Sequence, residues 1–157
     1  MTSDHSIDIR QVVMIGTAQE DYDELPSDIR DKATAALSLL QNNKRIAGKK
    51  FSLLTGNDKL KGIGELRYDE DGDTYRVYEI LQSKEVIYVL DAGKKKSKKG
   101  GAIPQEDINR LEERRLVAID DYNRNQGYYA LKFEERAKRR ETVEDMLAPQ
   151  LKPKGSQ

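Results

Sequence analysis

The stretch Ile63-Gly-Glu-Leu-Arg-Tyr-Asp-Glu-Asp-Gly-Asp-Thr-Tyr-Arg-Val-Tyr-Glu-Ile-Leu81 decides the fold, because it has the pattern of two strands around a tight turn. Residues 63–68 and 74–81 contain the β-branched and aromatic side chains that favour strands. Asp71-Gly72 lies between them, and this dipeptide is typical of a two-residue hairpin turn. The segment therefore predicts an antiparallel hairpin at the centre of a sheet.

A symmetric turn fixes which residues of the two strands face each other. Arg67 then pairs with Arg76, and Glu65 pairs with Tyr78 on the same face of the sheet. Two like charges placed directly opposite destabilise a sheet by roughly a few tenths of a kcal/mol. A hairpin with a purely structural role has no reason to carry such a pair, so the two arginines are candidate ligands of an anion.

A third strand is predicted over residues 85–92, after a short loop. If that loop also has an even length, Asp91 pairs with Arg76, and Arg67, Arg76 and Asp91 form a row on one exposed face. An ordinary cross-strand ion pair is the alternative interpretation of Arg76 and Asp91. The opposite face is then expected to pack on helices through Leu66, Val77 and Leu90.

The segment before the hairpin predicts one strand and two helices. Residues 7–15 form a partly alternating, β-branched run that is typical of a strand. Thr17-x-x-Glu20 is a capping-box pattern that should begin a short helix. After Pro26, residues 27–41 predict a second helix, whose apolar side chains share one stripe: Ile29, Ala33, Ala36, Leu37 and Leu40.

Two basic segments flank the predicted hairpin. Residues 44–62 are predicted to form a basic loop that contains Lys59 and Lys61. Five lysines fall within the six residues 94–99, directly after the third strand. Lysines held at the end of a buried strand are suited to bind a polyanion such as a phosphate backbone. A solvated lysine-rich loop is the alternative.

The C-terminal part predicts two further helices. Pro104 is a good first helical residue, and the apolar spacing continues that helix to about residue 121. Residues 123–127 break the pattern, residues 128–147 predict a separate charged helix, and a disordered tail is expected after it. We therefore expect a core domain over residues 1–122 and a C-terminal extension over residues 123–157. The expected fold is α+β, with helices packed on one face of a small twisted antiparallel sheet.

Composition excludes several kinds of site. The 157 residues include no cysteine and a single histidine, His5, so histidine- or cysteine-based metal and nucleophile sites are not expected. Lysine plus arginine and aspartate plus glutamate number 28 each, which gives zero net charge. No segment approaches the roughly 20 apolar residues that a membrane span needs, and no signal-peptide pattern precedes the first strand. A cytoplasmic protein that requires no metal or cofactor is expected.

RNA cleavage needs a base, an acid and positive charge for the phosphate. Arginine binds phosphate but holds its proton firmly, whereas a lysine crowded by other cations can release its proton. These rules assign the arginines to contact with the phosphate and the lysine run to positive charge or the acid. Asp91 or Glu65 is the candidate base, and Tyr78 can stack on a nucleobase.

The order of these motifs resembles the RelE/ParE superfamily of toxins, and most closely its phage-derived, HigB-like branch. The resemblance covers residues 7–122 and rests on Glu65-Leu-Arg67, Asp71-Gly-Asp-Thr-Tyr-Arg76, Tyr88-Val-Leu90 and Lys95-Lys-Ser-Lys-Lys-Gly100. It implies an endonuclease that cuts mRNA on the ribosome. It also implies a cognate antitoxin, expected to be a small helix-turn-helix protein.

The functional residues of that superfamily carry over unevenly. Arg76 matches the arginine that contacts the scissile phosphate, and Lys95 matches a basic residue that follows the last strand. Arg67 matches an arginine at the end of the first hairpin strand. Asp91 stands where the branch commonly has histidine, and Gly93 stands where it commonly has an aromatic residue. RNA binding is therefore better supported than cleavage.

These considerations predict a ribosome-dependent mRNA endonuclease toxin. The alternatives are a ParE-like toxin that binds a gyrase and a non-catalytic RNA-binding regulator. The candidate catalytic residues are Arg76, Lys95, Asp91 and Glu65. The candidate RNA-binding residues are Arg67, Lys59, Lys61, Lys94, Lys96, Lys98, Lys99 and Tyr78.

Overall fold

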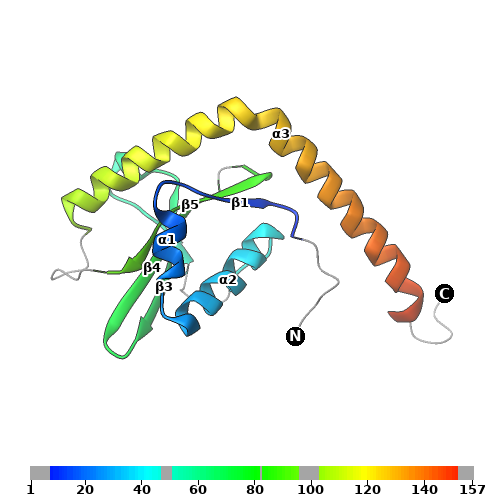
Figure 1. Ribbon diagram of the computed structural model, residues 1–157, viewed down its shortest axis with the longest axis horizontal. Coiled ribbons are helices and arrows are strands. Elements are labelled where there is room, and N and C mark those ends of the chain that lie inside the picture. Colours follow the sequence, from blue (N-terminus) through cyan, green and yellow to red (C-terminus); the bar gives the residue numbers. More distant parts are fainter. Residues whose placement is uncertain (1–7, 47–50, 82, 96–102, 152–157) are drawn as a thin grey trace.

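The computed structural model describes residues 8–46, 51–81, 83–95 and 103–151. Its elements are, in chain order, β1 (Gln11–Met14), α1 (Ala18–Asp23), α2 (Ser27–Gln41), β2 (Phe51–Leu53), the 3-10 helix η1 (Asp58–Leu60), β3 (Ile63–Glu70), β4 (Asp73–Ile80), β5 (Val86–Lys94) and α3 (Gln105–Leu151). The strands form one sheet in the order β1-β5-β4-β3-β2 (Figure 1), in which β1 and β5 are parallel and the other pairs antiparallel. The expected α+β class is confirmed.

The β3–β4 hairpin has the predicted register. Asp71 and Gly72 both have positive φ, 51° and 84°, which is the geometry of a two-residue type I′ turn. Arg67 faces Arg76, and Glu65 faces Tyr78. The turn sequence alone was therefore enough to place the two arginines opposite each other.

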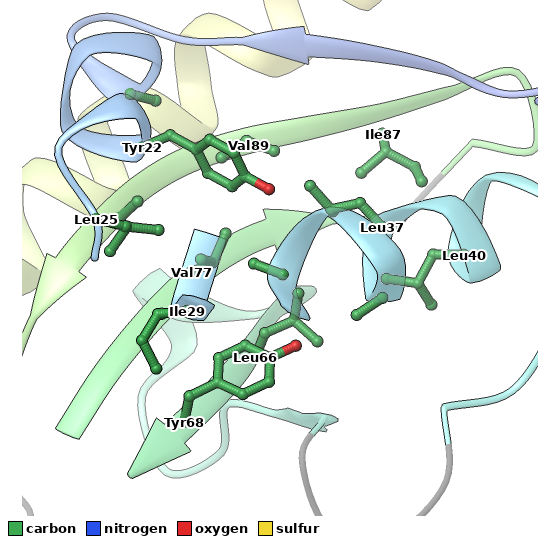
Figure 2. Packing of buried hydrophobic residues seen from close by; sticks show 14 residues of the cluster. Tyr22, Leu25, Ile29, Leu37, Leu40, Leu66, Tyr68, Val77, Ile87 and Val89 are labelled. Atoms are coloured by element: carbon green, nitrogen blue, oxygen red, sulfur yellow. The ribbon is translucent and has the colours of Figure 1, made fainter. Parts of the chain in front are cut away.

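One face of the sheet packs on α1 and α2. The five apolar residues predicted on the stripe of α2 are all buried there. Figure 2 shows Leu37 and Ile29 of α2 beside Leu66, Val77 and Val89 of the sheet. This layer forms the first apolar core.

The opposite face of the sheet packs on α3 and forms a second core. Leu111, Ala118 and Tyr129 of α3 are buried against this face. Its contributors from the sheet include Ile63, Tyr78, Ile80, Val86, Tyr88 and Leu90. Leu90 was expected on the face that carries Leu66 and Val77, and that prediction is wrong.

Two register shifts of one residue each explain the error. Ile80 pairs with Tyr88, one residue beyond the Ile87 that the predicted register requires, and a bulge in β5 adds the second shift. Tyr78 pairs with Asp91, whereas the next residue of β4, Glu79, pairs with Val89, so Leu90 is an extra residue in β5. Asp91 therefore lies opposite Tyr78, and Gly93 lies opposite Arg76. The predicted pairing of Asp91 with Arg76 is therefore wrong. The prediction also placed Asp91 on an exposed face, whereas only 9% of its surface is accessible.

Several element boundaries differ from the prediction. The side chain of Thr17 bonds to the Asp21 carboxylate (2.9 Å) and makes no capping hydrogen bond, so the predicted capping box is absent from α1. The segment predicted as a basic loop contains β2, which extends the sheet beside β3, and η1. Local propensity was too weak to reveal β2, which depends on its partner strand.

The helix α3 is longer than expected. It continues through the predicted break and has non-helical torsion angles only at Asn125 (φ −117°, ψ 15°), so the break is a kink. The Asn125 side chain donates to the backbone oxygen of Asp121 (3.0 Å), and the Tyr129 hydroxyl donates to the Asp121 carboxylate (2.5 Å). The expected boundary at residue 122 falls within this helix, and the tail from residue 152 lies outside the described residues. No helix in the described part of the chain is long and apolar enough to cross a membrane.

Glu79 is an unusual feature of the first core. Its side chain is completely buried between Val89 and Gly64, and neither carboxyl oxygen has a hydrogen-bond partner among the described residues. Burial, and secondarily the charge of Glu65, raises the pKa of Glu79 well above its ordinary value. The protonated carboxyl is therefore the form that the fold prefers.

This burial predicts that stability falls as the pH rises. Because the folded-state pKa of Glu79 is raised, the unfolded chain loses this proton first, so stability is full below the ordinary carboxyl pKa and falls above it. Glu79→Leu should raise the free energy of unfolding at pH 7 by roughly 1–3 kcal/mol, the cost of an unsatisfied buried polar group. Urea denaturation from pH 4 to pH 9 tests this. An equal pH dependence in Glu79→Leu and the parent chain would contradict it, and Glu79→Gln should flatten the curve with a smaller gain.

Candidate functional site

A cleft of about 390 Å³ lies where the C-terminal end of β5 meets the first turns of α3. Its walls come from α1, β4, β5 and α3, so it depends on the complete core. Its lining residues are Thr17, Asp21, Arg76, Tyr78, Asp91, Ala92, Gly93, Lys94, Lys95, Pro104, Glu106, Asp107, Arg110 and Arg114. The cleft thus brings together Arg76, Lys94, Lys95, Tyr78 and Asp91 of the predicted site.

Arg76 is fixed by a buried ion pair. Its Nη1 atom lies 3.2 Å from Oε2 of Glu65, and the two side chains are only 7% and 9% exposed. The same nitrogen donates to the hydroxyl of Tyr78 (3.1 Å). The Nε atom of Arg76 is buried and has no hydrogen-bond partner among the described residues. Arg76 is therefore held rigidly at the wall of the cleft, with only 6% of its surface accessible.

The facing arginines are separately compensated. Arg67 lies 3.6 Å from Asp69 on the exposed part of the hairpin, whereas Arg76 pairs with Glu65. Glu65 is not among the residues that line the cleft, so it orients Arg76 from behind. The like-charge register is therefore tolerated because each guanidinium has its own carboxylate, and repulsion alone does not imply a bound anion.

Asp91 anchors two arginines of α3. Its Oδ2 atom accepts from Nε (3.2 Å) and Nη2 (3.0 Å) of Arg110, and its Oδ1 atom accepts from Nη1 of Arg114 (3.3 Å). Arg114 also donates to the backbone oxygen of Leu90 (2.8 Å) and to Oγ1 of Thr17 (2.7 Å). Asp91 therefore fastens the start of α3 to β5 and α1.

Sequence analysis missed Arg110 and Arg114. They are four residues apart and so lie on one face of the helix that Pro104 was predicted to begin. Their spacing beside the apolar Leu111 was the available signal. What the sequence could not show is that this face turns toward the end of β5.

Lys95 lines the cleft and has a lowered pKa. Its backbone N–H donates to the Thr74 oxygen (2.6 Å), which fixes its position at the end of β5. Burial lowers the pKa of Lys95, and the guanidinium groups of Arg76 and Arg67 lower it further, against a smaller opposing effect of Glu65 and Asp69. A lowered lysine pKa was expected from crowding by other cations, and for Lys95 two of those cations are Arg76 and Arg67.

Tyr78 lines the cleft beside Arg76 but is only 8% exposed. Burial raises its pKa to about 12, against the opposing effect of the Arg76 hydrogen bond, so its hydroxyl stays protonated at neutral pH. Stacking of Tyr78 on a nucleobase stays a prediction and requires that the ring be uncovered.

Among the remaining predicted RNA ligands in the described residues, Lys94 lines the cleft and the others do not. Lys94 lines the cleft but pairs with Asp73 (3.1 Å) at the exposed surface. Lys59 and Lys61 are exposed and do not line the cleft. Lys96, Lys98 and Lys99 lie outside the described residues. Among the described residues, no group of three or more histidine, aspartate or glutamate side chains could hold a metal ion.

The family model described as "Phage derived protein Gp49-like (DUF891)" matches residues 20–116, which is more than half of the chain. This family is part of the RelE/ParE-like toxin–antitoxin superfamily. The chain therefore belongs to the Gp49-like family. No curated protein and no solved structure matched the chain.

The match includes most of the cleft and excludes most of α3. It begins within α1 and ends shortly after Arg114, so all four candidate catalytic residues fall inside it. The long continuation of α3 beyond residue 116 is a feature of this chain that the family match does not cover.

Proposed function

We propose that this protein is the toxin of a toxin–antitoxin pair and that it cleaves mRNA on the ribosome. The observation that carries the proposal is the position of Lys95, whose pKa is lowered, beside the rigidly held Arg76 in one open cleft. Membership of the Gp49-like family supports a toxin–antitoxin role and an antitoxin partner. The HigB-like branch and the helix-turn-helix nature of the antitoxin stay predictions.

The chemistry follows from the groups that line the cleft. Arg76 and the partly exposed Arg110 donate to the phosphate oxygens and stabilise the negative charge of the pentacovalent state. The 2′-oxygen forms a bond to phosphorus while the bond to the 5′-oxygen breaks, which yields a 2′,3′-cyclic phosphate and a 5′-hydroxyl. Lys95 gives its proton to the departing 5′-oxygen, and a base takes the proton of the 2′-hydroxyl.

The two carboxylates proposed as the base differ in what they can do. Both oxygens of Asp91 accept from arginines, so accepting a proton would require that Asp91 release one of them. Glu65 is behind Arg76 and outside the cleft lining. The clearest role of Asp91 is to position Arg110 and Arg114, and that of Glu65 is to position Arg76. The base assignment stays a prediction that Asp91→Asn and Glu65→Gln test by their pH–rate profiles.

Controlled expression in a bacterium tests the function. Growth should stop, and sequencing of RNA 5′-ends should show cuts within translated messages that disappear when translation is blocked. Growth arrest with intact messages and a DNA-damage response would favour the gyrase-binding alternative. RNA affinity without cleaved products, from the purified chain with active ribosomes, would favour the non-catalytic alternative.

Arg110→Gln is expected to weaken RNA binding, because it removes a cation from the cleft and leaves Asp91 paired with Arg114. Affinity for a single-stranded RNA with 2′-O-methyl groups should fall roughly tenfold at low salt. The slope of log affinity against log salt should decrease by about 0.7, which corresponds to one phosphate contact. Fluorescence anisotropy measures both quantities.

Arg124→Gln is the matched control for this binding experiment. Arg124 is exposed on the same helix, pairs with Asp120 (2.9 Å) and does not line the cleft. Equal losses in the two variants would place the RNA along α3 and away from the cleft.

A further inference from the structure

The outer side of α3 carries a solvent-facing stripe that continues across the kink. Its members recur at intervals of three or four residues, which keeps them on one side of a helix. Each is exposed, and the two large apolar members, Tyr128 and Leu131, are 53% and 56% exposed. The outer stripe consists of Val117, Asp120, Arg124, Tyr128, Leu131, Glu135, Arg139 and Thr142.

The outer stripe is complementary to itself in an antiparallel arrangement. When Tyr128 of one copy faces Leu131 of a second copy, the helical spacing brings the other six members into register. Arg124 then faces Glu135, Asp120 faces Arg139, and Val117 faces Thr142. Each pair occurs twice because the arrangement has two-fold symmetry. The pairs of Arg124 with Glu135 and of Asp120 with Arg139 join opposite charges, and Tyr128 and Leu131 place apolar side chains at the centre.

Neighbouring registers lack this complementarity. A register that brings Asp120 opposite Glu135 of the second copy sets two carboxylates against each other. A register centred on Arg124 places its guanidinium opposite the guanidinium of Arg124 in the second copy. Like charges across a helix pair are destabilising, so the charge pattern selects one register.

The position of the outer stripe leaves room for a second copy. The apolar residues of α3 in the second core are Ile108, Leu111, Ala118, Tyr122 and Tyr129, and none of them belongs to the outer stripe. Figure 1 shows α3 arching over the sheet with its bend between the two halves of the helix. The pairs nearest that bend, Tyr128–Leu131 and Arg124–Glu135, should make the closest contacts between two such helices.

We propose that the chain forms an antiparallel homodimer through the outer stripe of α3. The occupant is a second copy because the charge pattern is complementary to itself, which a stripe evolved for an unrelated partner has no reason to be. All eight members of the outer stripe lie beyond residue 116 and so outside the Gp49-like match. The proposal is independent of the proposed nuclease activity.

Measurement of the molar mass of the full chain by light scattering tests the dimer. The parent chain should have twice the chain mass of 17.9 kDa at micromolar concentrations. Glu135→Arg should shift it to the monomer mass, because the introduced guanidinium would face Arg124 of the second copy. The double variant Arg124→Glu with Glu135→Arg should restore the dimer by exchanging the charges. A monomeric parent chain up to 100 µM, a concentration chosen for the experiment at about the weak end of specific association, would overturn the proposal.

Glu134→Arg is the matched control, since Glu134 is exposed, adjacent to Glu135 and outside the outer stripe. It should leave the dimer intact. If Glu134→Arg and Glu135→Arg are both dimeric, the interface is elsewhere and the proposal fails. Loss of the dimer in both would mean that general charge on α3, and not the proposed register, controls association, which also overturns it.

Disulfide trapping tests the register directly. The chain contains no cysteine, so Tyr128→Cys with Leu131→Cys introduces the only thiols. Oxidation should link two chains into one species on a non-reducing gel. Tyr128→Cys with Gly127→Cys, which lacks the facing partner, should link at least tenfold less. Equal linking in both variants would contradict the proposed pairing.

Discussion

Replacing Arg76 with methionine is expected to lower message cleavage roughly 100- to 1000-fold and to relieve growth arrest. This is the usual cost of losing one donor that stabilises developing negative charge. The guanidinium is held by Glu65 and Tyr78 at the wall of the cleft, and its Nε atom is without a partner among the described residues. Single-turnover cleavage by purified protein with programmed ribosomes measures the loss.

The buried ion pair complicates this experiment and also provides its control. Removal of Arg76 leaves the Glu65 carboxylate buried without its partner, which costs roughly 3–5 kcal/mol of stability. An inactive Arg76→Met variant could therefore simply be unfolded. The double variant Glu65→Gln with Arg76→Met contains no buried charge at this position and should recover most of the stability. It should remain inactive.

Two outcomes would contradict the assignment of Arg76. Cleavage restored in the double variant would show that Arg76 acts only by neutralising Glu65. Full toxicity of a folded Arg76→Met variant would remove the cleft as the site of action. The cleavage rate of Arg76→Lys should lie between those of the parent chain and Arg76→Met, because lysine retains the charge but lacks the planar set of donors.

The hairpin shows how much of the fold the sequence could predict. Asp71-Gly72 sets the turn, and the turn sets the pairing of Arg67 with Arg76 through purely local geometry. The stripe on α2 was predictable for the same reason, since helical spacing is a local property. In each case a short segment contains all the information that its conformation requires.

The errors arose where one residue or a distant segment decides the structure. The connection between β4 and β5 shifts the register by one residue and the extra residue Leu90 shifts it by another, so Asp91 lies two positions from its predicted partner. No local pattern marks such a bulge. Arg110 and Arg114 reach Asp91 only because α3 crosses the second face of the sheet, which is a long-range feature. The cleft was therefore predicted from its strand side alone.

This difference changes the chemical interpretation of the site. An exposed row of Arg67, Arg76 and Asp91 suggested a carboxylate available as a base, but Asp91 is occupied by two arginines. The acidic and basic side chains of the cleft are largely paired with one another. Lys95 is then the best candidate for proton transfer, because its surroundings disfavour the ammonium form.

Lys95→Arg is accordingly expected to lower the cleavage rate by roughly 100-fold or more, the usual contribution of a general acid. Arginine keeps the positive charge at the end of β5 but does not give up its proton near neutral pH. RNA affinity should therefore change less than threefold, by a rough estimate from retained charge, while kcat falls. In the parent chain the rate should decrease as the pH rises through the lowered pKa of Lys95, because the neutral amine has no proton for the 5′-oxygen.

Lys94→Arg provides the comparison that isolates the role of Lys95. Lys94 is the adjacent residue, but its ammonium group pairs with Asp73 at the surface, so this substitution should leave both rate and affinity within about twofold. If Lys95→Arg retains the parent rate and the falling limb of the pH profile, Lys95 contributes charge only and another group is the acid. If both lysine variants lose activity equally, the whole lysine segment acts as an electrostatic surface, and the proton must come from solvent or from the ribosome.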